Sequence, residues 1–550
     1  MHPAVIWFKR DLRVADHAAV ASAYACAPDQ PLRGLYIIEP GLWRQPDAAA
    51  QHWAFVAECL HELAAALHAL GGELLVRQGE ATAVLAELQA GRPFTHLLAH
   101  EETGNAFTYA RDLAVAAWCR QVGVQFQEWP QMGVVRRLGN RDDWHLRWER
   151  FMRTAPWPLP NFGDSPQTQL SHPPDPRAPA DVNLRQPSRA LALPTSAHLG
   201  LHDSPPPRRQ PGGRSAALAV LDEFLHDRCG QYRGGISSPL SAPTACSRLS
   251  PYLAWGVLGT REVVQATRAR LAALEAIDVP WAARQQAGLK GFLSRMHWHC
   301  HFIQKLEDEP ELEWRNLHRG YDGLREDEHN PAHFAAFTEG RTGWPMVDAC
   351  VAMLRATGWI NFRMRAMLVS VAAYPLWLHW RPVGLWLARQ FLDYEPGIHW
   401  SQLQMQSGTT GINATRVYNP IKQARDHDPH GHFVRRWLPH MRRVPPQWLF
   451  EPWLMPPEVQ AQCGLQVGVD IPVPLVDLAE ALRTAKARLH GRRAQPEVRA
   501  DVGEVVRKHG SRTFRDGSPR GGQTRSRGPR HAQAPSGAEA APPPQMSLDF

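Results

Sequence analysis

The chain has 550 residues, of which 44% are hydrophobic, with 21 Trp, 8 Cys and a formal net charge of +8. This length and apolar content predict a large buried core and two or more folding units. No apolar run approaches the roughly 20 residues of a membrane span and no signal peptide is evident, so we expect no membrane segment and a cytoplasmic location. The Cys residues lie far apart without a C-x-x-C pair, which argues against structural zinc, an iron–sulfur cluster or a disulfide scaffold.

The first 135 residues have the pattern of an α/β domain. Short apolar runs at residues 5–8, 34–38, 73–76 and 95–99 are separated by stretches with helical spacing. Strands that alternate with helices predict a parallel, Rossmann-like sheet. We therefore expect an α/β domain over residues 1–135.

A Pro-rich segment separates this domain from the next. Fourteen of the 57 residues from 155 to 211 are Pro, with little apolar periodicity, so we interpret residues 136–214 as an interdomain linker. Residues 215–490 lack β-branched alternation and carry long apolar stretches at helical spacing. That pattern predicts an all-helical domain.

The C-terminal segment, residues 491–550, turns to Gly, Ser, Pro and Arg. This composition cannot bury enough surface to fold, so we expect a disordered tail. Eight Arg or Lys residues stand against one Asp between residues 507 and 530, a local charge of +7. A basic arm suits nucleic acid, because affinity rests largely on phosphate neutralisation and counterion release, and a solvated tail without a partner is the alternative.

Residues 244–252, T-A-C-S-R-L-S-P-Y, place small hydroxyl and thiol side chains before an apolar segment. Backbone N–H groups and hydroxyls at a helix entrance form a cradle for phosphate oxygens, so a nucleotide cofactor is one hypothesis. The alternative is an ordinary helix start, with Ser247 or Ser250 as the N-cap and Pro251 at the first helical position.

Five ordered blocks of this sequence resemble photolyases and cryptochromes. They are V-I-W-F-K-R-D-L-R-V-A-D-H (5–17), C-S-R-L-S-P-Y-L-A-W-G-V-L (246–258), N-P-A-H-F-A-A-F-T-E-G-R-T-G-W-P (330–345), T-G-W-I-N-F-R-M-R (357–365) and Y-N-P (418–420). The resemblance implies an α/β antenna domain followed by an all-helical domain that holds FAD.

The function that the resemblance implies is a light-dependent DNA photolyase that uses reduced FAD to split UV-induced pyrimidine lesions by electron transfer. A cryptochrome-like blue-light photoreceptor without repair activity is the alternative. A third interpretation, without light, is a flavoprotein that only binds nucleic acid through its arm.

The resemblance assigns one group of residues to FAD. Residues 246–250 fall on the phosphate-binding segment, with Cys246 where a Thr is usual, and a thiol is a weaker donor than a hydroxyl. Arg365 and Asp393 fall on an ion pair near the isoalloxazine ring, for which a plain salt bridge between two helices is the alternative. The implied FAD residues are Tyr232, Cys246, Ser247, Arg248, Leu249, Ser250, His299, Arg365, Asp393, Glu395 and His399.

The implied lesion site departs from the family pattern. Trp298 matches a tryptophan that stacks on a flipped pyrimidine dimer, and Arg363 matches a position near the lesion's phosphate. Arg295, Phe362 and Ala366 stand where a carboxylate, an Asn and a Met are usual, so hydrogen-bonding groups are lost. A different lesion, a single-stranded substrate or no lesion at all are therefore open.

Three histidines surround Trp298. On a helix, His297 and His301 would share one face while His299 points elsewhere. One of them could serve as an acid near the flavin, and ordinary hydrogen bonds in a polar cavity are the alternative.

The implied route of photoreduction is also altered. Trp380 matches the middle of the family's three tryptophans, but the inner position falls on Leu403 or Gln404. Trp400, together with Trp377 or Trp386, could provide another route, and core packing is the alternative for each ring.

Two further partners follow from local resemblance. Residues 101–112 resemble the region that approaches a folate antenna, with Thr108 in place of a Glu, so a second chromophore, folate or another, stays open. The last six residues, Q-M-S-L-D-F, resemble a peptide that docks into the bacterial sliding clamp through Gln545, Met546, Leu548 and Phe550. We expect a monomer, no metal, and DNA as the main partner.

Overall fold

The computed structural model describes residues 4–28, 30–159, 191–412 and 416–510. Its N-terminal part is a five-stranded, fully parallel sheet with strand order β3-β2-β1-β4-β5, so the predicted α/β class is confirmed. The strands are β1 (Ala4–Phe8), β2 (Arg33–Ile38), β3 (Glu73–Gln78), β4 (His96–His100) and β5 (Gln125–Trp129). The helices around them are α1 (Ala18–Cys26), α2 (Pro40–Trp43), α3 (Ala50–Ala69), α4 (Ala81–Gly91) and α5 (Ala106–Val122).

The central strand β1 divides its side chains between two cores. Val5 and Trp7 belong to a cluster with side chains of α4 and α5. Ile6 and Phe8 belong to a larger cluster that includes α3 and extends into the helical domain. A parallel strand that is buried on both faces needs an apolar side chain at every position, and residues 5–8 are therefore all apolar.

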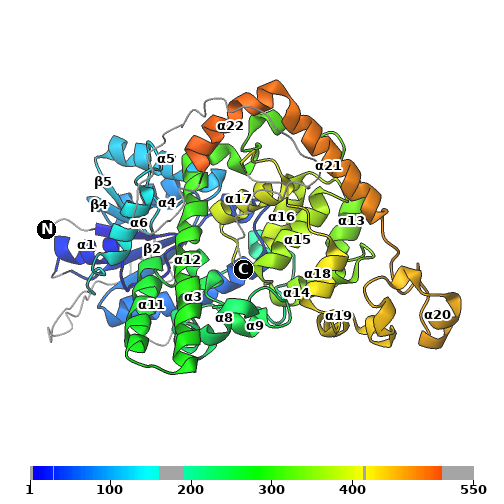
Figure 1. The fold of residues 1–550 in the computed structure, drawn as a ribbon. Coiled ribbons are helices and arrows are strands. Elements are labelled where there is room, and N and C mark those ends of the chain that lie inside the picture. The colour runs from blue at the N-terminus through cyan, green and yellow to red at the C-terminus, as the bar shows by residue number, and fades with distance from the viewer. Residues whose placement is uncertain (1–3, 29, 160–190, 413–415, 511–550) are drawn as a thin grey trace, which may run out of the picture.

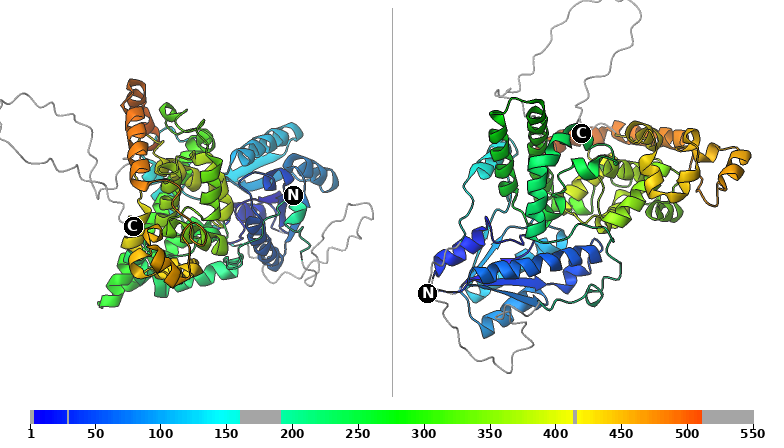
Figure 2. Two further views of the ribbon diagram at one scale, coloured as in Figure 1. Left: turned by 90° about the vertical axis from the view of Figure 1, so that its right-hand side faces the viewer. Right: turned by 90° about the horizontal axis from the view of Figure 1, so that it is seen from below.

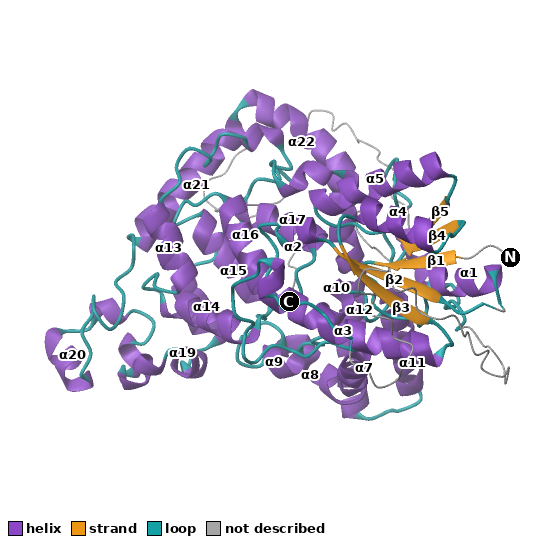
Figure 3. Ribbon diagram, turned by 180° about the vertical axis from the view of Figure 1, so that it is seen from behind, coloured by secondary structure: helices purple, strands orange, loops and turns teal. Residues whose placement is uncertain are grey.

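The second domain is all-helical, as predicted, and α12 lies between the sheet and the group of helices that contains α15, α16 and α17 (Figure 1). Figure 3 shows that the strands lie at one side of the molecule only, and Figure 2 shows the helical domain from two further sides. Within the described ranges, no helix has the length and apolar character needed to cross a membrane.

The α-helices of the helical domain are α7 (Arg214–Glu223), α8 (Cys229–Gly235), α9 (Ala242–Ala245), α10 (Ser250–Ala254), α11 (Thr260–Glu275), α12 (Pro280–Asp308), α13 (Pro331–Glu339), α14 (Pro345–Thr357), α15 (Phe362–Ala373), α16 (Trp380–Gln390), α17 (Pro396–Ser407), α18 (Pro420–His427), α19 (His432–Trp437), α20 (Pro457–Cys463), α21 (Leu478–Ala494) and α22 (Pro496–His509).

The predicted linker contains a helix that composition did not reveal. Helix α6 (Trp144–Arg153) buries Trp144, Trp148 and Met152, which recur at a spacing of four and therefore share one face. Arg268 of α11 also pairs with Glu149 of α6 at 2.8 Å. The interpretation of residues 136–214 as a linker is therefore wrong for residues 144–153, because an apolar stripe on an otherwise polar helix docks it against α11 and α12.

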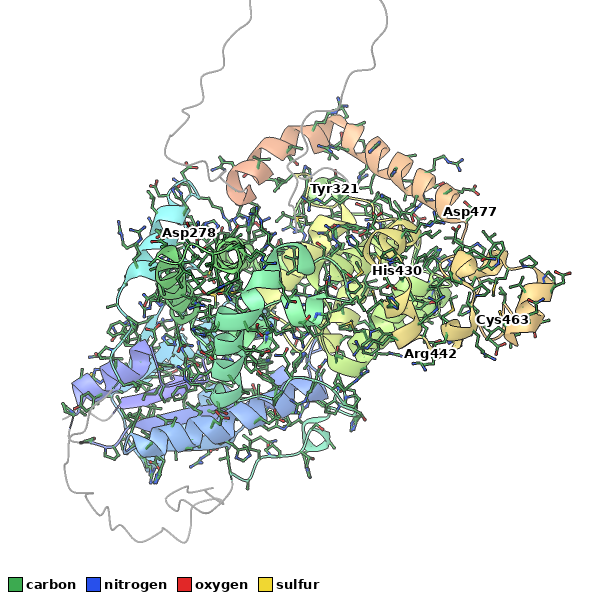
Figure 4. The ribbon with its side chains drawn as sticks, turned by 60° about the horizontal axis from the view of Figure 1, so that its bottom comes forward. Asp278, Tyr321, His430, Arg442, Cys463 and Asp477 are labelled. Atoms are coloured by element: carbon green, nitrogen blue, oxygen red, sulfur yellow. The ribbon has the colours of Figure 1, made fainter. Side chains whose placement is uncertain are left out.

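The predicted tail begins too early. Residues 491–509 complete α21 and form α22, which lie along one edge of the helical domain above Tyr321 (Figure 4). Arg492 donates to the carbonyl oxygens of Gly320 and Asp322, both at 2.6 Å, and Val498 is fully buried. Docking against the domain supplies the burial that local composition lacks. Residues 511–550, including the predicted clamp peptide, lie outside the described residues.

Candidate functional site

A cavity of about 320 Å³ opens in the helical domain, between α8, the segment after α9, α12, α15 and α17. It brings together most of the residues assigned from sequence. Those that line it are Tyr232, Cys246, Ser247, Arg248, Ser250, Arg295, Trp298, His299, Phe362, Arg363, Arg365, Ala366, Asp393, Glu395 and His399. Leu249 is fully buried without lining the cavity, and Trp380 and Trp400 also lie outside its wall.

The segment from Cys246 to Leu249 is held from outside through its carbonyl groups. Arg228 donates to the carbonyl oxygen of Cys246 and, at 3.2 Å, to that of Ser247. Gln210 donates to the carbonyl oxygen of Arg248 at 2.9 Å. Three consecutive peptide groups are thereby fixed at the cavity wall, where the phosphate cradle is predicted.

The simple helix-cap alternative for this segment is wrong. Helix α10 begins at Ser250, its N-cap is Leu249, and no side chain caps it. Pro251 occupies the second helical position rather than the first. Arg248 adopts φ = 62°, in the left-handed region that a non-glycine residue rarely occupies, so its surroundings must maintain this conformation.

Two guanidinium groups give this wall a positive charge. Arg248 lies 3.7 Å from the ring centroid of Trp359, and burial lowers its pKa to about 10, so it stays protonated at neutral pH. Arg365 donates to Asp393 Oδ2 at 2.9 Å and to the carbonyl oxygen of Ile360 at 2.7 Å. Burial alone would raise the pKa of Asp393, but its ion pair and hydrogen bond with Arg365 keep that pKa below the usual range.

Glu395 lies on the same wall and contacts Arg10 of the N-terminal domain. Burial raises its pKa to about 7, against the opposing charge of Arg10, whose Nη2 lies 3.6 Å from Glu395 Oε2. Arg10 follows β1 and also donates to the carbonyl oxygens of Ala254 and Tyr394, at 2.9 and 2.6 Å.

The two histidines that line the cavity are held neutral. Burial lowers the pKa of His299 to about 4 and that of His399 to about 3. His399 Nε2 lies 2.9 Å from the carbonyl oxygen of Gly384, whereas His299 Nδ1 is buried without a hydrogen-bond partner among the described residues. His297 and His301, as the helical spacing predicts, share the opposite face and contact Trp144 of α6.

Aromatic and apolar groups form the other part of the wall. Trp298 stacks on Phe302, with ring centroids 5.7 Å apart and an interplanar angle of 27°. Phe362 and Ala366 add apolar surface, and Arg363 Nε is buried without a partner in the described part of the chain. The arrangement offers a flat platform for a planar ring beside a cationic group.

The two tryptophans predicted for electron transfer are neighbours behind the cavity. The ring centroids of Trp380 and Trp400 are 5.9 Å apart, both rings are buried, and Trp380 Nε1 donates to Asn316 Oδ1 at 2.8 Å. The other two candidates pack elsewhere: Trp386 against Phe337, and Trp377 beside the guanidinium groups of Arg325 and Arg488.

Several residues that hold the site are not predicted from the sequence. Arg228 lies on a π-helical turn (Phe224–Arg228), four residues before Tyr232, and Phe302 lies four residues after Trp298. Helical spacing from Trp298 would have found Phe302. No local signal distinguishes Arg228 or Gln210, because both act on a segment distant in sequence.

These residues fit a large nucleotide such as FAD. Two guanidinium groups suit a pyrophosphate, and the platform suits a planar ring. His299 Nδ1 is buried without a hydrogen-bond partner among the described residues, so a ligand can supply one.

The α/β domain contains a much smaller cavity at the carboxyl ends of its strands. Its volume is about 60 Å³. The Arg111 guanidinium forms part of its wall and pairs with Glu39, Glu102 and Asp112 at 2.9, 2.6 and 2.9 Å. This is about a fifth of the volume of the first cavity, and whether a second chromophore binds here stays a prediction.

A buried group of Asp11, His17 and His100 has the composition of a metal site. His17 Nδ1 and His100 Nε2 accept hydrogen bonds from the N–H groups of Val20 and Ala18, so the other ring nitrogens carry the hydrogens and donate to Asp11. No lone pair of either ring is left for a cation, and the group is a hydrogen-bonded cap for α1.

Comparison with known proteins agrees with this geometry. A model described as the FAD binding domain of DNA photolyase matches residues 292–491, and one described as DNA photolyase matches residues 4–136. A deoxyribodipyrimidine photo-lyase of Streptomyces griseus is 28% identical over 494 residues, covering 88% of this chain and 98% of that protein. A cryptochrome DASH of Gloeobacter violaceus is 27% identical over 521 residues, covering 90% of this chain and 99% of that protein.

Solved structures show the same fold. A bacterial class III photolyase from Agrobacterium tumefaciens aligns with a TM-score of 0.73 at 23% identity, over 90% of this chain and 98% of that one. A cryptochrome from Synechocystis aligns with a TM-score of 0.74 at 20% identity, over 88% of this chain and 99% of that one.

Proposed function

The chain belongs to the photolyase and cryptochrome family, and from this premise we propose that it is a light-dependent DNA photolyase that splits UV-induced pyrimidine lesions. Bound, reduced FAD supplies the light-absorbing electron donor of this chemistry. The proposed substrate is damaged DNA with its lesion flipped into the cavity of the helical domain, and the proposed place of work is the cytoplasm.

The observation that supports this proposal most strongly is that a charged pair and an aromatic pair line the same cavity. The same space is lined by the Arg365–Asp393 pair and by Trp298 with Phe302. A cofactor held at the charged wall and a base stacked on the aromatic wall would therefore lie in one cavity. Short separation is what electron transfer between two bound groups needs.

We propose the following division of work among the cavity residues. Trp298 would stack on the lesion, which is worth about 1–3 kcal/mol per base. Arg363 would contact its phosphate. The segment from Cys246 to Leu249, whose carbonyl groups Arg228 binds, would hold FAD together with Arg365 and Asp393. The remaining FAD assignments, Tyr232, Ser250, His299, Glu395 and His399, rest on the same cavity.

The proposal is tested by illuminating the reduced protein with oligonucleotides that carry a thymine cyclobutane dimer or a (6-4) photoproduct, single- and double-stranded. We expect light-dependent restoration of at least one lesion, measured by chromatography of the digested DNA. Trp298→Ala should weaken binding of the damaged strand about 5- to 100-fold. The control Trp314→Ala removes a half-exposed Trp outside the cavity and should have no effect. No repair of any of the four substrates by a protein with intact FAD would refute the proposal.

A cryptochrome-like photoreceptor is the second candidate, and a specific observation favours it. Phe362 and Ala366 present only apolar atoms where a lesion needs hydrogen bonds. Reversible photoreduction of the flavin, together with the absence of repair, would support this function instead.

We also propose that Trp400 and Trp380 carry electrons to the cofactor. Their centroid separation of 5.9 Å is short enough for transfer between rings, and His399, which lines the cavity, contacts Trp400 at 5.0 Å. Trp400→Phe should slow photoreduction of the bound flavin by an external reductant, while Trp386→Phe should not. Equal rates in both variants would exclude this route.

For the C-terminal arm we propose contact with DNA and, through its last six residues, with a bacterial sliding clamp. The basic count and the Q-M-S-L-D-F ending support this. A chain that ends at Pro544 should lose clamp binding in a pull-down, and equal capture of both chains would refute the clamp contact.

A further inference from the structure

Two glutamines on α17 carry buried amide atoms without partners in the wall of the cavity. Gln402 and Gln406 both line it, one helical turn apart, and Gln406 is 1% exposed. Gln406 Nε2 donates to Gln402 Oε1 at 3.4 Å. This leaves Gln402 Nε2 and Gln406 Oε1 buried without hydrogen-bond partners among the described residues.

A buried polar atom without a partner is costly, since each such group loses about 1–3 kcal/mol of solvation. Two of them on one turn of α17, in side chains that line a cavity, are available to a ligand that enters it. The linked pair offers one donor and one acceptor. If both amides rotate by half a turn, the pair still offers one of each.

This pattern complements the hydrogen-bonding edge of a nucleobase. Thymine and cytosine each present a donor next to an acceptor on the edge that pairs in a duplex, and enzymes that flip a base out of the stack read this edge. The pyrimidine ring of a flavin has the same local pattern, so the chemistry alone allows two sources.

The position of the pair favours the base. Ser401 Oγ donates to the carbonyl oxygen of Phe302 at 3.2 Å, which places this turn of α17 against the stretch of α12 that carries the aromatic platform. Phe302 stacks on Trp298. A ring stacked on that platform would present its edge toward the neighbouring wall, and the polar side chains there come from α17.

We propose that Gln402 and Gln406 read the hydrogen-bonding edge of the flipped base and thereby determine substrate specificity. They replace the groups that Arg295, Phe362 and Ala366 no longer provide. The inference rests on the proposed function, because it requires that a base enters this cavity.

The test compares full-length, FAD-loaded wild type with Gln402→Met and Gln406→Met, which keep side-chain length and remove the amide. The matched control is Gln423→Met, because Gln423 is also buried with a partnerless Oε1 but lies outside the cavity wall. Two quantities are measured: the flavin absorption spectrum with FAD content, and the affinity for an oligonucleotide carrying a thymine dimer relative to its undamaged counterpart.

We expect each cavity variant to bind the damaged strand about 5- to 100-fold more weakly, with FAD content and spectrum unchanged and the control like wild type. Unchanged affinity in both variants would overturn the inference. Loss of FAD or a shifted flavin spectrum, with DNA affinity per bound flavin unchanged, would also overturn it and assign the pair to the flavin. If wild type itself does not prefer the damaged strand, the proposed function fails, and that result is distinct from a failure of the glutamines alone.

Discussion

At the scale of single residues, the charged wall of the cavity depends on the pair Arg365 and Asp393. The Asp393 side chain is 3% exposed, so removing its charge leaves Arg365 without its carboxylate partner in a poorly solvated site. Asp393→Asn should lower the free energy of unfolding by about 3–5 kcal/mol and reduce FAD content. Thermal unfolding with flavin absorbance checks this, with Asp426→Asn as the control, because its pair with Lys422 is exposed and worth about 1 kcal/mol or less.

Glu395 should introduce a measurable pH dependence. Its pKa of about 7 in the folded protein lies above the value of about 4.5 expected after unfolding, so the folded state holds a proton that the unfolded state releases. Its contribution to stability is fully present below about pH 4.5 and is lost as the pH rises through about 7, on the order of 1.4 kcal/mol per pH unit between these values. The difference in unfolding free energy between wild type and Glu395→Gln should therefore change across pH 5–7. A constant difference over this range would contradict the prediction.

At the scale of elements, the segment from Cys246 to Leu249 acts as a preformed support because Arg228 holds its carbonyl groups. Hydrogen bonds from a charged donor are worth about 1.5–3 kcal/mol each. Arg228→Met should weaken FAD binding about 10-fold or more, and Arg228→Lys should restore part of it, as measured by flavin fluorescence on titration of the apoprotein. Arg425→Met, which removes a surface pair with Glu451, is the control. Equal affinity of Arg228→Met and wild type would show that the support is not needed.

An element could be predicted from the sequence where its residues carry the apolar spacing of a strand or a helix. The apolar runs of β1 to β4 and the helical periodicity beyond residue 215 predicted both domains. Helix α6 was missed because only three of its residues are buried, within a segment dominated by neighbouring Pro, and α22 because its stability comes from contacts with residues near Gly320 rather than from composition. Arg228, Gln210 and the amides of Gln402 and Gln406 could not be assigned from sequence, because their significance lies in where the fold places them.

At the scale of the whole molecule, Arg10 links the two domains. From the end of β1 it reaches the carbonyl oxygens of Ala254 and Tyr394 and lies 4.4 Å from the ring centroid of Trp255. Arg10→Met should leave these acceptors buried and lower the free energy of unfolding by about 3 kcal/mol. Denaturant unfolding, followed by tryptophan fluorescence and by flavin release, should show a lower midpoint by both probes. Arg442→Met replaces an exposed side chain in the segment that precedes α20, and it should leave both midpoints in place; Figure 4 labels Arg442 and Cys463, the last residue of α20.

The proposed function requires one cavity to hold both the flavin and the damaged base closely enough for an electron to pass between them. Its most direct measurement is the fluorescence lifetime of the reduced flavin in the purified protein, with and without a saturating oligonucleotide that carries a thymine dimer. We expect a shorter lifetime with the damaged strand, no change with the undamaged strand, and loss of the effect in Trp298→Ala. An unchanged lifetime with the damaged strand bound would contradict it.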